Sequence, residues 1–153
     1  FRRATGVELT LIPFKGGGEA QQGILGGQVP FMFATTIGIL PRVRSGQLRG
    51  LAVSSAKRIA AAPELPTVAE SGVPGFDVVA WFGFFAPAGT PKALVDRLSA
   101  ETRTALSAGD LRKRLIDLGA EPLGSTPEEF SAYVQAEFQR WGRLAREAGI
   151  RLD

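Results

Sequence analysis

The sequence predicts an α/β protein in which a parallel sheet is covered by helices. Two observations predict this class: apolar segments of strand length alternate with helical segments over the first third of the 153 residues, and the second half has helical periodicity. Apolar residues make up 44% of the chain and charged residues 22%, as in ordinary globular domains. A chain of this length can bury a sizeable core.

The first third is predicted to run strand, helix, strand, helix, strand. The strands are expected at residues 7–13, 29–34 and 48–55, with Pro30 suited to the start or the edge of the second one. One helix is expected in AQQGIL, ending at Gly26–Gly27. Another is expected to start at Thr35 or Thr36 and to be kinked or shortened by Pro41. Parallel strands need such helical crossovers, so the order favours a parallel sheet.

The remainder is predicted to contain loops, one more strand and three longer helices. Residues 57–80 are rich in turn residues, with a short helix in TVAESG, and a strand follows at 81–86. The composition changes near residues 79–81, which we interpret as a boundary between two structural units. The helices are expected to begin at Thr90-Pro91, at Asp110 and at Thr126, where Glu129 completes a capping box. Glycines are expected to end the second and third of them, at Gly119 and Gly149.

Aromatic residues gather in two places, and both are predicted to lie in the core. The first is a run on the last strand, Trp81, Phe82, Phe84 and Phe85. The second is the apolar face of the final helix, which includes Phe138 and Trp141.

Composition excludes several kinds of chemistry. The chain has no Cys and no His, which excludes thiol nucleophiles, disulfides, zinc sites of the usual ligands and a Ser-His-Asp triad. No Asp-rich loop has calcium-binding spacing. The net charge is only +3 and the basic residues are scattered, which does not predict nucleic-acid binding. No apolar run reaches the roughly 18–20 residues of a membrane span. A binding protein is the class that remains.

Two turns that lead into helices are candidate binding elements. In FKGGGE, residues 14–19, backbone N–H groups and Lys15 can converge on an anion, and Ala34-Thr35-Thr36 offers two hydroxyls at the next helix start. In an open parallel sheet such turns reach the same edge, so we predict an anion near the backbone of 15–17 and the Thr35 hydroxyl. The glycines can equally be turn residues. The missing GK[ST] ending argues against a nucleoside triphosphate.

Most of the chain resembles a known family. The segments that carry the resemblance are IPFKGGGEAQQGILGGQVPFMF, LPRVRSGQLRGLAVSSAKR and PELPTVAESGVPGFDVVAWFGFFAPAGTPK. They resemble the C-terminal half of Bug-type extracytoplasmic solute receptors, the substrate-binding components of tripartite tricarboxylate transporters. LIDLGAEPLGSTPEEFSAYVQAEFQRW is similar to the C-terminal helices of that family.

The resemblance implies a periplasmic-binding-protein-like fold of two lobes, of which only part is present here. Residues 1–79 would be the C-terminal portion of the second lobe. Residues 80–153 would be a crossover strand and the C-terminal helices that pack on the first lobe. The implied function is non-catalytic binding of a small organic acid in the cleft between the lobes, in the periplasm, for membrane transporter subunits. It implies no cofactor and no metal, and any signal peptide would lie outside this chain.

The resemblance also implies which residues face the ligand. Phe14, Lys15 and Gly16, with Gly17, match an aromatic-Lys-Gly turn that faces the cleft. Ala34, Thr35 and Thr36 stand where the family usually has an Asp after the strand. This departure removes a carboxylate from the site, which favours a ligand with carboxylate and apolar groups over one with an ammonium group.

Two alternatives to the receptor function remain open. One is a small α/β hydrolase or transferase with Thr35 or Ser54 as nucleophile and Lys15 as base. The other is a shortened chain without ligand competence, because FRRATG resembles the last turn of a helix and predicts an upstream segment. If part of the receptor is missing, an upstream segment or a homodimer is expected to cover the apolar face of the last helices: Leu94, Leu98, Phe130, Tyr133, Val134, Phe138 and Trp141.

Overall fold

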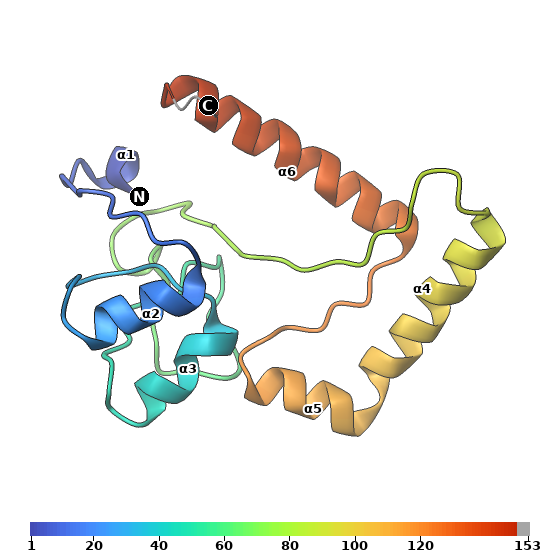
Figure 1. The fold of residues 1–153 in the computed structure, drawn as a ribbon, viewed down its shortest axis with the longest axis horizontal. Helices are drawn as coiled ribbons and strands as arrows, with labels where there is room; N and C mark the ends of the chain where they lie inside the picture. Colours follow the sequence, from blue (N-terminus) through green and yellow to red (C-terminus); the bar gives the residue numbers. More distant parts are fainter. Residues whose placement is uncertain (150–153) are drawn as a thin grey trace. The chain divides into compact units, whose positions relative to one another are not determined.

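A computed structural model describes residues 1–149 of the chain (Figure 1). Those residues form six helices: α1 (Arg2–Thr5), α2 (Gly17–Leu25), α3 (Thr36–Arg44), α4 (Lys92–Ser107), α5 (Gly109–Asp117) and α6 (Pro127–Glu147). The chain divides into two compact units. Unit 1 is Phe1–Gly83 with Lys113–Pro122, and unit 2 is Phe84–Arg112 with the residues from Leu123 onward. No helix among the described residues has both the length and the apolar character needed to cross a membrane.

The helices that were predicted from local pattern are present. The first, α2, ends in a Schellman motif, in which Gln28 N donates to Gly23 O and Gly27 N donates to Ile24 O, with Gly27 at φ 71°. The next, α3, has Thr35 as its N-cap and continues past Pro41 to Arg44. The last, α6, begins with the predicted capping box. These features depend on residues close in sequence, which is why the pattern predicts them.

Two predicted caps are wrong. The N-cap of α4 is Pro91, and the hydroxyl of Thr90 instead donates to Pro87 O at 2.8 Å. Helix α5 begins at Gly109, so Asp110 lies inside its first turn. In both cases the predicted residue is not the one that directly precedes the helix, so it does not occupy the N-cap position.

The predicted parallel sheet is not confirmed within residues 1–149. The sole pairing assigned there is one parallel bridge, Val53 with Thr67, flanked by Val78 N donating to Ser54 O at 2.8 Å. The other predicted strands, residues 7–13, 29–34 and 81–86, form no assigned strand. Leu11 is 87% exposed, because no described segment pairs with or covers it. A strand needs a hydrogen-bonded neighbour, and no strand pairing is assigned to these segments among residues 1–149.

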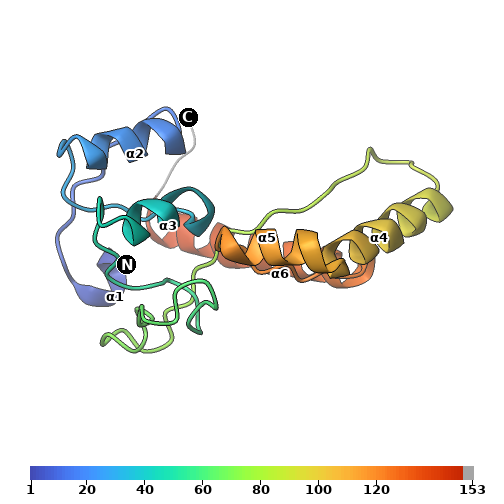
Figure 2. The ribbon, with the colours of Figure 1, turned by 90° about the horizontal axis from the view of Figure 1, so that it is seen from below.

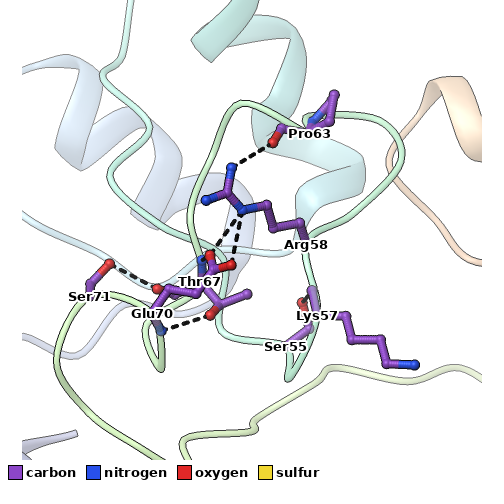
Figure 3. A network of polar contacts seen from close by, with 7 residues as sticks. All are labelled: Ser55, Lys57, Arg58, Pro63, Thr67, Glu70 and Ser71. Carbon is purple, nitrogen blue, oxygen red and sulfur yellow. Dashed lines mark hydrogen bonds and ion pairs between the residues drawn. The ribbon is translucent and has the colours of Figure 1, made fainter.

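The prediction of a helix in TVAESG is wrong, because the segment forms only a single turn. Thr67 Oγ1 accepts from Glu70 N at 3.0 Å and Glu70 Oε2 accepts from Thr67 N at 2.7 Å, as in a capping box (Figure 3). The helix stops there because Gly72 adopts φ 108° and Pro74 follows. The Thr67 amide and the Arg58 guanidinium hold the pKa of Glu70 below its ordinary value.

Unit 1 has a small buried core. Its buried apolar side chains are Val29, Leu40, Val53, Ala62 and Val68. Helix α3 is tied to the end of α5, because Thr36 Oγ1 donates to Gly119 O at 2.7 Å. Gly119 has φ 92°, and a Cβ there would lie 2.9 Å from Thr36 Cβ, so both conformation and space require glycine.

Unit 2 contains α4 and α6, which contact each other, and none of its described apolar side chains is buried. Figure 2 shows the segment before α4 as extended chain. The prediction that Phe138 and Trp141 are core residues is wrong for this chain, since Phe138 is 80% exposed and Trp141 39%. The same holds for the run of Trp81, Phe82, Phe84 and Phe85, whose side chains are exposed although the Phe85 and Phe130 rings lie 5.3 Å apart. On the apolar face that is expected to be covered by an upstream segment or a homodimer, Leu94, Leu98 and Tyr133 are also exposed.

Candidate functional site

The start of α2 is a glycine turn with open space beside it. Gly16 is the N-cap, in extended conformation, and none of the glycines at 16–18 adopts the left-handed conformation that favours glycine. A Cβ added at any of the three would meet no atom within 4 Å. Neither conformation nor packing in the described chain therefore requires glycine here. What the three glycines do provide is room for a small molecule to approach the backbone.

Hydrogen-bond donors without acceptors line this turn. The amides of Gly17, Gly18 and Glu19 donate to no group in the described chain, as expected for the first turn of a helix that lacks a side-chain cap. Lys15 is exposed and its Nζ makes no ion pair with residues 1–149. Its amide is already used, because it donates to Glu19 Oε2 at 2.7 Å. The turn thus offers a cation and free amides at the positive end of a helix, which suits a carboxylate.

The ring of Phe14 packs on α2. It lies over Gly23, where an added Cβ would be 2.7 Å from Phe14 Cζ and 2.9 Å from Cε1. Phe14 is accordingly half-buried, while Lys15 and the glycines beside it are exposed. Phe14 therefore packs in part against α2 and remains in part exposed, directly before Lys15 in the sequence.

At the start of α3 the two threonine hydroxyls differ. Thr35 is exposed, makes no capping bond, and its Oγ1 has no hydrogen-bond partner among residues 1–149. The hydroxyl of Thr36 already donates its proton to Gly119 O, as described above. Ala34 is exposed and carries no polar group. Of the two predicted hydroxyls, Thr35 is therefore the one free to donate to a ligand.

The two helix starts belong to neighbouring helices in unit 1. Helices α2 and α3 lie close together (Figures 1 and 2), and a Cβ added at Gly38 in the first turn of α3 would be 2.6 Å from Gln21 Nε2 of α2. Gln21 and Gly38 are not among the predicted site residues, and Glu19 is included only as the last residue of the FKGGGE turn. The sequence signal that could have indicated this contact is Gly38, because a glycine within a helical pattern often marks a place where another segment packs closely.

The described residues give no support to an enzyme. Ser54 Oγ donates to Val78 O at 2.7 Å, so its proton is held by a backbone carbonyl. Thr35 has no base within hydrogen-bond distance among residues 1–149. A nucleophile of this type needs an adjacent base to be activated. In the same part of the chain no group of three or more acidic side chains could hold a metal ion.

Comparisons with known proteins agree with the resemblance seen in the sequence. The protein BugT of Bordetella pertussis is 35% identical over 152 residues, which is 99% of this chain and 47% of BugT. A solved structure of an R. palustris protein with adipate is 36% identical, with a TM-score of 0.90 over 97% of this chain and 50% of that one. The periplasmic binding protein BugD is 38% identical, with a TM-score of 0.86 over 98% of this chain and 51% of BugD.

The fold of this chain is therefore that of about half a periplasmic binding protein. It spans about half the length of the first curated relatives that it matches. Residues 1–150 match the family described as tripartite tricarboxylate transporter family receptor. The chain belongs to this receptor family.

Proposed function

We propose that this chain forms one side of the ligand site of a solute receptor that binds a small organic acid and does not catalyse a reaction. The observation that carries the proposal is the start of α2, where Lys15 is exposed and the amides of Gly17 and Gly18 have no acceptor among residues 1–149. A carboxylate can accept several of these donors at once, and hydrogen bonds to a charged group are the stronger kind. The similar R. palustris protein was solved with adipate, which supports an acid ligand.

The charges at the site favour a diacid over an amino acid. Lys15 is the one cationic side chain of the turn, and the carboxylate of Glu19 is held by the Lys15 amide. Ala34 adds no acceptor at the start of α3. An ammonium group would meet free amide donors, and the one carboxylate of the turn, Glu19, already accepts from the Lys15 amide through Oε2, which leaves the desolvation of the ammonium group only partly compensated. The ligand class we propose is a dicarboxylate with an apolar chain.

The rest of the receptor is also part of this proposal. Residues 1–79 would belong to the second lobe, and residues 80–153 would cross over and pack on the first lobe. Relatives about twice as long support this division, as does the exposed apolar face of α4 and α6. The first lobe would cover that face and would supply the other side of the cleft. The receptor would act in the periplasm, as the similar periplasmic binding protein does, and would deliver its ligand to membrane transporter subunits.

Titration calorimetry of the protein expressed from its complete reading frame tests this proposal. We expect adipate and succinate to bind and glutamate to bind at least about tenfold more weakly, since an unpaired ammonium group loses about 1.4 kcal/mol or more. Lys15→Met is expected to weaken adipate binding. Lys57→Met is the matched control, because Lys57 is an exposed lysine of the same unit that does not belong to the glycine turn. A protein that binds none of these acids would contradict the function, and glutamate binding as tight as adipate binding would contradict the ligand class.

A further inference from the structure

Gly23 occupies a position in α2 where a glycine is unfavourable for the helix itself. It lies in the helix interior, is buried, and has ordinary helical conformation without a positive φ. Glycine in such a place lowers helix stability relative to alanine. Its carbonyl accepts from Gln28 N, a bond that any residue could make. Backbone conformation therefore gives no reason for glycine at this position.

Space gives the reason. A Cβ at position 23 would lie 2.7 Å from Phe14 Cζ and 2.9 Å from Phe14 Cε1, and 3.5 Å from Gln28 Oε1. Carbon atoms in contact prefer a separation of roughly 3.5–4.0 Å, so the ring would have to move by about 1 Å. The ring is a rigid group joined to the chain one residue before Lys15. A ring displaced from α2 would change the position of the aromatic group next to Lys15, either by rotation about the side-chain torsions or by a shift of the backbone that leads into the glycine turn.

We propose that Gly23 is a positioning residue of the ligand site, which acts by letting the Phe14 ring rest on α2. This inference rests on the proposed function, because it assigns Gly23 a role at the carboxylate site. With the ring on α2, Lys15 N reaches Glu19 Oε2 and the glycine amides remain open. The distance from Gly23 to the ring thus sets where Phe14 and Lys15 meet the ligand.

A matched pair of substitutions separates this role from helix stability. Gly23→Ala and Gly142→Ala each replace an interior glycine of a helix, but a Cβ at Gly142 meets only Arg146 Nη1, at an ordinary 3.5 Å. In the protein expressed from its complete reading frame, Gly142→Ala is expected to leave the Kd for adipate unchanged. Gly23→Ala is expected to raise that Kd by about five- to tenfold, the size of a lost aromatic contact. Helical content by circular dichroism should be retained in both.

A second substitution shows whether Gly23 acts through Phe14. In a Phe14→Leu background the ring is gone, so Gly23→Ala should add no further loss of adipate affinity. A crystal structure of Gly23→Ala should show the ring displaced from α2. Losses that simply add in the double variant, an undisplaced ring, or an unchanged Kd would each overturn the proposal. A wild-type protein that binds no dicarboxylate would overturn the proposed function itself, which is a distinct result.

Discussion

The first turns of α2 and α6 have the same acidic residue at the third helical position but different caps. In α6, Thr126 Oγ1 accepts from Glu129 N at 3.2 Å and Glu129 Oε2 accepts from Thr126 N at 2.8 Å, so the capping box is complete. In α2, Glu19 accepts from Lys15 N, but Gly16 has no side chain to accept from Glu19 N. One missing hydroxyl leaves the start of α2 open to an outside acceptor, whereas α6 closes on itself.

Removing one amide from the open turn should have the largest effect. Gly17 is the first residue of α2, a position where proline is tolerated because the N–H has no intrahelical acceptor. Gly17→Pro should weaken adipate binding by about 1.5–3 kcal/mol, the value of a hydrogen bond to a charged group. Gly17→Ala keeps the amide and is the control in calorimetry. Equal affinities of the two variants would mean that this amide does not bind the ligand.

Opening the closed turn should change stability and leave binding alone. Thr126→Val removes the oxygen that accepts from Glu129 N, and should destabilise the fold by about 1 kcal/mol. Thr126→Ser retains the oxygen and should remain close to wild type in urea denaturation. Adipate affinity should not change in either variant. A loss of affinity in Thr126→Val would show that the start of α6 is coupled to the ligand site.

Adding a cap to the start of α2 should raise stability by less than removing the cap of α6 lowers it. Gly16→Ser gives α2 an N-cap oxygen that can accept from Glu19 N, and the extended backbone at this position accommodates any residue. Stability should rise by a few tenths of a kcal/mol, since serine is a modestly better cap than glycine. Adipate affinity should fall, because the serine hydroxyl competes with the ligand for the amide. Tighter binding in Gly16→Ser would contradict the comparison.

The smallest effect is the pH dependence of the closed turn. The Thr126 amide and hydroxyl hold the pKa of Glu129 below its ordinary value of 4.5. A carboxylate with a lowered pKa in the folded state adds stability above the unfolded value, and this contribution is lost as the pH falls below it. Between pH 7 and pH 3, Glu129→Gln should therefore lose less stability than wild type in urea denaturation. Identical losses would indicate that Glu129 adds no pH-dependent stability.

Local features of this fold are predictable from sequence, and features that need distant partners are not. The cap at Thr126 and the glycine that ends α2 depend on residues within one or two turns. The predicted strand at 7–13 has the right pattern, but a strand also needs a neighbour that the described chain does not provide. Phe138 has a core-like position on an amphipathic helix, and its burial requires a covering surface absent from residues 1–149.

The candidate site shows the same limit. Sequence locates the glycine turn and Thr35, because glycines before a helix and threonine at an N-cap are local signals. It gives Thr36 the same role as Thr35, although the bond from Thr36 to Gly119 spans 83 residues. Phe14 and Gly23 are only nine residues apart in the sequence, yet they make contact only because the Phe14 ring points toward α2. Pattern alone carries no information on that direction.

The central claim is that the open start of α2 binds a carboxylate, and amide chemical shifts test it most directly. Adipate would be added to the 15N-labelled protein expressed from its complete reading frame, with spectra recorded at each step. We predict saturable shifts at Gly17 and Gly18 and at Thr35, the N-cap of α3, with Glu129 in the capped turn of α6 unmoved. Saturable binding that leaves Gly17 and Gly18 unmoved would contradict the account.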